Sequence, residues 1–297
     1  VVLCPCSSDP HSLDAVILPT LKTVILDGTS PHTVDPCYPA VCEEILNFGK
    51  FWRAEKLQNS SREIIEVTNQ NKALHKTASN YMQAAGKLLL DNYKTAVACT
   101  DKQKTLRFAD NLCKKYIKKT AGTPKEWTRY LSSITPSGFV FLGESGNYTD
   151  NTIIIEDSFG YAATVIIEAV RQNALSSGYE IITLKSGLLP SYILDGVIIP
   201  ALNLSFLRED RLSKINLDTR RIHSRRFTKY SLLNRSRERI KFNFKATKEL
   251  LNSATYTLKE AKATHDILES YYINAMDFEK LKVFTDDFAD KLFNFKC

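Results

Sequence analysis

A short apolar run that ends in a carboxylate is the first candidate for chemistry in this sequence. Residues 24–27 read Val-Ile-Leu-Asp, a pattern typical of a strand with an aspartate at its C-terminal tip. In enzymes that transfer phosphoryl groups, an aspartate at such a tip holds Mg²⁺. Most strand-end aspartates only stabilise a turn, so the interpretation of Asp27 as a metal ligand depends on the rest of the chain.

The stretch that leads to Asp27 occurs twice. Residues 13–19, LDAVILP, are matched by residues 194–200, LDGVIIP, at an offset of 181. Two copies of one unit in a chain of this length indicate a duplicated domain. The offset places Arg208 at the position of Asp27, and a guanidinium cannot bind a metal ion. The second copy is therefore expected to have lost the metal-side carboxylate.

The second copy also contains a strand, a tight loop and a helix, which together resemble a phosphate-binding loop. The loop and the start of the helix, residues 157–164, read DSFGYAAT. Gly160 and Thr164 match the glycine and the Mg²⁺-binding hydroxyl of such a loop, but Ala163 stands where the lysine belongs. Asp157 replaces the first glycine and would repel a phosphate. The pattern predicts a degenerate phosphate loop, and a strand–helix connection without any ligand is the alternative.

The first copy should have a phosphate loop of its own, and the offset puts its lysine at about position −18, ahead of the residues given. Ser7, Ser8 and Asp9 follow the first expected strand, residues 1–4. At the carboxyl edge of a parallel sheet they would contact a nucleotide or the water around Mg²⁺. The alternative is a loop in which Asp9 caps a short helix that begins at Pro10.

Composition and periodicity define the elements that must position these residues. The chain has 297 residues, 43% of them hydrophobic and 25% charged, which is typical of a soluble globular protein with two domains. Without an apolar run of about 20 residues or a charged leader, we expect a cytoplasmic protein with no membrane segment. Apolar positions with a helical period predict long helices, at about 60–98, 101–118, 235–270 and 277–293.

The predicted fold class is α/β, with two P-loop NTPase-like parallel-sheet modules in tandem that form a pseudo-dimer. The first module spans residues 1–122 and carries a helical hairpin at 42–120. The second, degenerate module spans 123–297 and carries a hairpin at 235–296. Residues 122–127 are expected to form the hinge.

Two further clusters allow other ligands. Cys4, Cys6, Cys37 and Cys42, or His32, could form a zinc site, although their spacing is not that of a common zinc module. The segment from Arg208 to Lys241 has a net charge of +8, against +7 for the whole chain. This basic segment could be a solvated face or could track a nucleic-acid backbone. A third interpretation is that one of its arginines reaches the phosphates of a nucleotide held by the first copy.

A family resemblance supports the nucleotide interpretation. Residues 6–19, 24–36 and the segment ITPSG at 134–138 resemble an uncharacterised family of bacterial tandem P-loop ATPase-like proteins. The resemblance implies two P-loop modules and the binding of ATP with Mg²⁺, and the chain departs from it at Ala163 and in the missing first loop. The predicted function is an ATPase or a nucleotide- or small-molecule-kinase-like protein that acts on a small molecule or a protein. The alternatives are a non-catalytic scaffold and a basic nucleic-acid-binding module.

Overall fold

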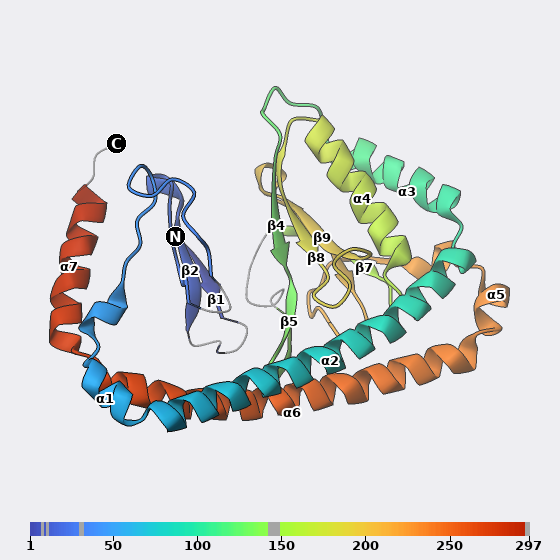
Figure 1. Ribbon diagram of the computed structural model, residues 1–297. Helices are drawn as coiled ribbons and strands as arrows, with labels where there is room; N and C mark the ends of the chain where they lie inside the picture. Colours follow the sequence, from blue (N-terminus) through green and yellow to red (C-terminus); the bar gives the residue numbers. More distant parts are fainter. Residues whose placement is uncertain (7–8, 10–11, 30–32, 142–148, 295–297) are drawn as a thin grey trace. The chain divides into compact units, whose positions relative to one another are not determined.

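The computed structural model describes residues 1–6, 9, 12–29, 33–141 and 149–294 of the chain. The chain divides into two compact units (Figure 1). Unit 1 consists of Val1–Lys76 and Thr257–Cys297, and unit 2 consists of Thr77–Tyr256. Each unit therefore contains residues from both sequence copies.

Unit 1 contains a three-stranded antiparallel sheet in the order β1–β2–β3. Its strands are β1 (Val2–Pro5), β2 (Leu13–Leu18) and β3 (Thr23–Leu26). Pro10, the expected first residue of a short helix, lies outside the described residues. The chain is already in β2 from Leu13 onward, and the N–H of Ser12 donates to the carbonyl of Asp9. A 3₁₀ turn, Pro19–Leu21, joins β2 to β3 and ends on Lys22 in the left-handed region, at φ 50°.

Unit 2 is built on one six-stranded mixed sheet in the order β11–β7–β10–β9–β8–β4. Its strands are β4 (Lys125–Tyr130), β7 (Asn151–Glu156), β8 (Glu180–Lys185), β9 (Leu194–Ile199), β10 (Leu204–Glu209) and β11 (Arg220–His223). β7 runs parallel to both of its neighbours, β10 and β11, whereas β9 is antiparallel to β8 and β10. A separate hairpin consists of β5 (Ser132–Thr135) and β6 (Gly138–Phe141).

These sheets correct two expectations. A tandem of two parallel modules is not what forms, because the described strands of unit 1 are all antiparallel and the unit 2 sheet is mixed. The expected hinge at residues 122–127 runs into β4, which pairs with β8. The coarser expectation of a mixed α/β fold is confirmed.

Strand register confirms the repeat around Asp27. In β2 and β3, Ala15 lies opposite Leu26, and in β9 and β10, Gly196 lies opposite Leu207. Both residues of the second pair lie 181 positions after those of the first. The second turn also ends on a left-handed residue, Asn203, at φ 48°. The two hairpins are thus structural copies of one another.

The helices repeat as well, at a shift of 176 residues. The first set is η2 (Phe48–Phe51), α1 (Ala54–Asn59), α2 (Ser61–Cys99) and α3 (Lys102–Tyr116). The second set is η4 (Ser224–Phe227), α5 (Tyr230–Asn234), α6 (Arg237–Ala275) and α7 (Phe278–Asn294). α2 and α6 both contain 39 residues, so the long helices that periodicity predicts are present.

Each unit joins the end of one copy's long helix to the 3₁₀ turn of the other copy. In unit 2 the N–H of Lys229 donates to the carbonyl of Cys99 at 2.7 Å, and the N–H of Asp101 donates to that of Phe227 at 2.9 Å. The rings of Phe108 and Phe227 lie 5.3 Å apart beside these bonds.

Unit 1 repeats this junction. The N–H of Arg53 donates to the carbonyl of Ala275 at 2.8 Å, and the N–H of Asp277 donates to that of Phe51 at 3.0 Å. Phe284 packs on Phe51 with 5.4 Å between ring centroids. Every residue here lies 176 positions from its counterpart in unit 2. The last helix of each copy therefore joins the other copy's turn, which differs from the hairpin expected within each copy.

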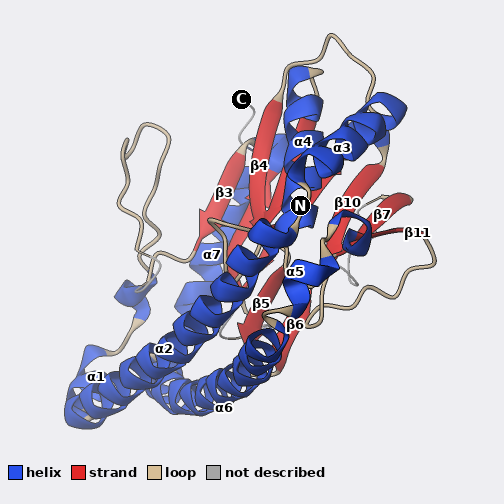
Figure 2. Cartoon of the chain, turned by 90° about the vertical axis from the view of Figure 1, so that its right-hand side faces the viewer, coloured by secondary structure: helices blue, strands red, loops and turns tan. Residues whose placement is uncertain are grey.

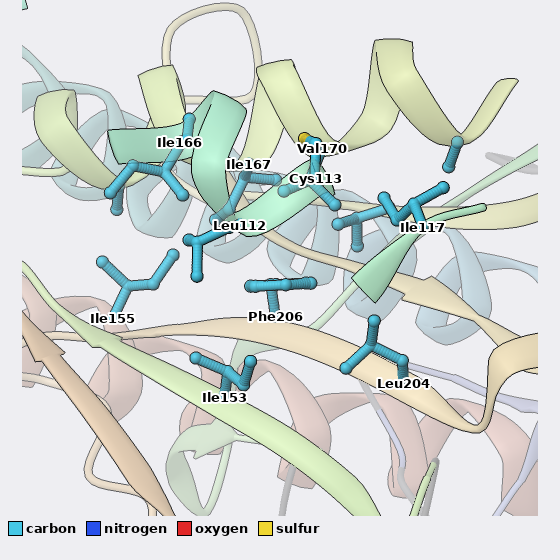
Figure 3. Close-up of a cluster of buried hydrophobic side chains, with 14 of the residues drawn as sticks. Leu112, Cys113, Ile117, Ile153, Ile155, Ile166, Ile167, Val170, Leu204 and Phe206 are labelled. Atoms are coloured by element: carbon cyan, nitrogen blue, oxygen red, sulfur yellow. The ribbon is translucent and has the colours of Figure 1, made fainter. Parts of the chain in front are cut away.

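The main core lies in unit 2, where α4 (Tyr161–Ser176) packs on the sheet and on α3. Figures 1 and 2 both show α3 beside α4. Figure 3 shows the buried cluster, in which Phe206 of β10 and Leu112 of α3 lie with Ile166 and Ile167 of α4. Among the described residues, none of the helices combines the length and apolar composition needed to cross a membrane.

Candidate functional site

The turn between β7 and α4 brings the chain to the N-terminus of α4 through a left-handed glycine. Gly160 is the N-cap of α4 and adopts φ 83°, which favours glycine. A Cβ atom added to Gly160 would lie 2.6 Å from the Cδ1 atom of Ile193. Glycine is therefore required here both by the backbone conformation and by the side chain that fills the adjacent space.

The anion position at this helix terminus is occupied by the chain itself. The buried carboxylate of Asp157 accepts the N–H of Ala163 at 2.9 Å and the N–H of Phe159 at 3.1 Å. Backbone N–H groups and the helix dipole at such a terminus bind anions in general. A phosphate at this place would have to displace Asp157 and would be repelled by it.

Thr164 and Ala163 do not complete a phosphate site in unit 2. The hydroxyl oxygen of Thr164 accepts the N–H of Leu194 at 3.1 Å, which ties α4 to the first residue of β9. Ala163 is fully buried in the core. The two positions that would hold Mg²⁺ and the phosphates in a working loop thus serve the packing of α4.

Arg208, at the end of β10, lies in a buried ion cluster. Its Nε and Nη2 atoms donate to Oδ1 of Asp195 at 2.8 and 2.6 Å, and its Nη1 atom donates to Oδ2 of Asp210 at 2.7 Å. Nη1 also donates to the carbonyl oxygen of Asp157 at 3.3 Å. The guanidinium therefore links the ends of β7, β9 and β10.

The protonation equilibria of this cluster reflect burial and pairing. Burial by itself lowers the pKa of Arg208, but the carboxylates of Asp195 and Asp210 outweigh it and raise that pKa. Burial raises the pKa of Asp195 despite the attraction of Arg208. Burial also acts to raise the pKa of Asp210, but Arg208 and the hydrogen bonds of Ser213 lower it overall. Arg208 therefore stays charged, and its guanidinium is hydrogen-bonded to Asp195 and Asp210.

A small cavity lies against this cluster. Its volume is about 30 Å³, and it is lined in part by Asp195, Arg208, Asp210 and Asn92. The Nδ2 atom of Asn92 is buried and has no hydrogen-bond partner among the described residues. Sites for drug-sized ligands have volumes of roughly 300–1,000 Å³, so this cavity has room for water-sized groups and not for a nucleotide.

Several cations of the basic segment have internal partners. Arg221 pairs with Glu209 at 2.8 Å and with Glu156 at 3.2 Å, and Lys214 pairs with Glu209 at 2.7 Å. Arg220 donates to the hydroxyl of Tyr116 at 2.9 Å. The segment is thus partly a set of contacts that hold β11 and its flanking loop to the sheet.

Asp27 has a different environment in unit 1. It follows β3, is exposed, and its Oδ1 atom accepts the N–H of Thr29 at 2.9 Å and the hydroxyl of Thr29 at 2.7 Å. Its own N–H donates to the carbonyl of Asp14 at 2.8 Å. Asp14 and Asp27 are the register equivalents of Asp195 and Arg208. An ion pair in unit 2 thus corresponds to two neighbouring acidic residues in unit 1.

The remaining predicted site residues are not gathered around Asp27. Ser7 and Ser8 lie outside the described residues. The carboxylate of Asp9 pairs with Lys262 of α6 at 3.3 Å. Within the described ranges, no group of three or more His, Cys, Asp or Glu side chains is arranged to hold a metal ion. Mg²⁺ is commonly bound by one or two carboxylates together with water and substrate phosphates, so the pair of Asp14 and Asp27 suits it chemically.

Sequence reasoning missed the roles of three residues in unit 2. Asp195 could have been found, because it repeats Asp14 in the duplicated stretch and lies opposite Arg208, one position beyond the pair of Gly196 and Leu207. The sequence predicts that the charge of Asp157 would repel a phosphate, but it does not predict that Asp157 itself binds the N-terminus of α4. Asn92 gave no signal, since a lone polar residue on a long helix is normally solvated.

Comparison of the chain with protein-family models, with curated proteins and with solved structures finds no match.

Proposed function

We propose that the chain is a P-loop-type nucleotide-binding protein in which the second copy has lost its ligand and the first copy carries the metal-side carboxylate, Asp27. ATP with Mg²⁺ is the proposed ligand, and ATP hydrolysis or kinase-like phosphoryl transfer is the proposed reaction class. The two copies descend, on this proposal, from one phosphate-binding module.

The observation that carries the proposal is the register match between Asp27 and Arg208. Asp27 follows Leu26 of β3, and Arg208 follows the equivalent Leu207 of β10. In unit 2, β10 lies parallel to β7, and β7 leads into the N-terminus of α4 at Gly160. An open sheet binds ligands at the carboxyl ends of its parallel strands. In unit 2 this edge is filled by Asp157 and Arg208, whereas in unit 1 the equivalent position is an exposed carboxylate.

The chemical role of each group follows from its type. Mg²⁺ supplies charge neutralisation for the phosphates when bound. Asp27, held by Thr29, would orient an oxygen ligand toward the ion, with Asp14 adjacent. In the second copy Arg208, Asp195 and Asp210 replace that arrangement with a neutralised structural link.

Calorimetric titration of MgATP tests the proposal. We expect saturable binding to the wild-type chain that weakens at least about tenfold in Asp27→Ala. The matched control is Asp218→Ala, an exposed loop aspartate in unit 2, which should bind as wild type. Absence of binding, or equal binding by Asp27→Ala, would contradict the proposal.

The nucleic-acid alternative has less support. Arg208, Lys214 and Arg221 of the basic segment are paired with carboxylates in unit 2, which reduces the charge available to a phosphate backbone. The scaffold alternative is favoured by a separate observation, the exposure of the strands in unit 1.

A further inference from the structure

The three strands of unit 1 are uncovered although they carry the sequence of a buried sheet. In unit 2 the strands of the repeated hairpin are buried, with five of the six residues of β9 and every residue of β10 in the buried class. In unit 1 no residue of β1, β2 or β3 is buried. Leu3 is 58% exposed on one face of this sheet, and Val24 is 52% and Leu26 46% exposed on the other. Exposed apolar surface that gathers in one place marks interaction sites on soluble proteins, and here both faces and the β3 edge carry it.

Unit 2 shows what covers the same strands there. The outer edge of β10 pairs in parallel with β7 over six residues, from Leu204 opposite Asn151 to Glu209 opposite Glu156. The chain then continues from β7 into α4, which packs on the sheet and on α3. One strand–loop–helix segment thus closes both the edge and one face.

The corresponding edge in unit 1 has no strand partner among the described residues. Because the N–H of Asp27 points to β2, and N–H groups alternate in direction along a strand, those of Val24 and Leu26 point to the outer edge of β3. These are the residues that match Ser205 and Leu207 of β10. An edge with free donors and acceptors readily pairs with another strand.

The equivalent helix surface of unit 1 is less completely covered than that of unit 2. α3 buries Thr105, Ala109 and Leu112 against the α4 side of unit 2. The equivalent residues of α7 are Leu281, Thr285 and Phe288, which are half-buried, and no residue of α7 is fully buried. They lie at a helical spacing that defines one face. Both surfaces that α4 and β7 join in unit 2 are therefore present in unit 1 and are less buried there.

We propose that unit 1 is a docking surface for one strand–loop–helix segment of the β7–α4 kind. The strand of this partner would pair in parallel with the outer edge of β3, and its apolar helix would pack on the α7 face that includes Leu281 and Phe288. The occupant is an apolar strand of about six residues followed by a helix with an apolar face that includes small residues. This docking does not depend on nucleotide binding, since the segment that occupies the same place in unit 2 has lost the phosphate site.

The chain supplies a probe for the test, a synthetic peptide of residues 150–177 with a fluorophore at its N-terminus. Fluorescence anisotropy should show saturable binding to the wild-type chain. Val24→Pro removes an outward N–H group without disturbing the ladder to β2. Leu26→Lys places a charge where the equivalent Leu207 packs beside Ile154 of β7, on the sheet face away from α4. Each variant should weaken binding at least about tenfold, whereas Ile65→Lys, at a 60% exposed position of α2, should leave it unchanged.

The helix contact has its own matched pair on α7. Leu281→Lys should weaken binding, whereas Val283→Lys, at a 63% exposed position on a different face, should not. Hydrogen exchange should show that the probe protects the amides of Val24 and Leu26 and leaves those of β10 unchanged. Unchanged β10 amides would exclude the possibility that the probe replaces the chain's own β7 in unit 2. Circular dichroism confirms that each variant is folded.

Three results would overturn the proposal. The first is no binding of the probe by the folded wild-type chain. The second is binding that neither Leu26→Lys nor Leu281→Lys weakens. The third is a concentration-dependent dimer in sedimentation that Val24→Pro abolishes and the probe does not displace, because the occupant of the edge would then be a second copy of the chain.

Discussion

The hairpins β2–β3 of unit 1 and β9–β10 of unit 2 have the same register, the same 3₁₀ turn and the same left-handed residue after it. Their burial nevertheless differs: Leu207 is 1% exposed and its equivalent Leu26 is 46% exposed. The local sequence therefore determines the hairpin, and the neighbouring elements determine whether it becomes a core. The contribution of each residue to stability should follow burial and not sequence identity.

The same comparison separates the two polar ends of these hairpins. Arg208 is buried with Asp195 and Asp210 around it, whereas Asp27 is exposed and bonded to Thr29. A buried charge loses its hydration and needs partners at close range. An exposed carboxylate keeps its water and remains available to a ligand.

The largest expected difference is between these two residues. Arg208→Met leaves the buried carboxylates of Asp195 and Asp210 without their partner, so we expect the free energy of unfolding of unit 2 to fall by about 3–5 kcal/mol. Asp27→Ala should change the stability of unit 1 by no more than about 0.5 kcal/mol. Chemical denaturation monitored by hydrogen exchange in each unit measures both values.

A second substitution checks the cause of this loss. Adding Asp195→Asn to Arg208→Met removes one unpaired buried charge and should recover part of the stability. If the double variant is as unstable as the sum of the single variants, the cost of Arg208→Met comes from lost packing and not from charge.

The duplicated hairpin could be predicted from sequence because apolar alternation, proline and the repeat are local signals. The long helices were likewise visible as periodic patterns. The mixed sheet was not, since nothing in Leu194–Ile199 shows that β9 runs antiparallel between β8 and β10. The exchange of terminal helices was also hidden, because the bond from Lys229 to Cys99 joins residues far apart in the sequence.

The candidate site was predicted only in part. The position of Asp27 and its match with Arg208 follow from the offset alone. The role of Asp157 as an internal anion depends on the path of four residues through a tight turn, which composition does not determine. The partners of Arg208 depend on side-chain packing at the ends of three strands.

The second prediction uses one residue type in both units. Leu207→Ala should lower the free energy of unfolding of unit 2 by about 2–5 kcal/mol, the usual cost of a large-to-small change in a core. Leu26→Ala should cost less than about 1 kcal/mol, because half of its side chain is already exposed. Equal losses in thermal or chemical unfolding would contradict the difference in burial.

A third prediction compares two glycines. Gly160→Ala places a Cβ atom against Ile193 and a side chain at φ 83°, so we expect unit 2 to lose about 1–3 kcal/mol. Gly28→Ala meets no atom within 4 Å and should leave the stability of unit 1 unchanged. Combining Gly160→Ala with Ile193→Val removes the nearest methyl group and should restore only the steric part of the loss.

The smallest expected effect concerns acid stability. In unit 2 Arg171 donates to both carboxylate oxygens of Glu126 at 2.7 and 2.6 Å, and these bonds, together with that of Thr183, lower the pKa of Glu126 although burial opposes them. The unfolded chain therefore takes up a proton at higher pH than the folded one. The stabilisation is complete above the ordinary glutamate pKa of about 4.3 and is lost as the pH falls through the lower value of the folded state.

Glu126→Gln should lower the stability of unit 2 at pH 7 by about 1 kcal/mol and flatten its dependence on pH below 5. Glu66→Gln, which breaks an exposed pair with Arg62 in unit 1, should change neither quantity, and a matching loss there would show that exposed and half-buried pairs contribute alike.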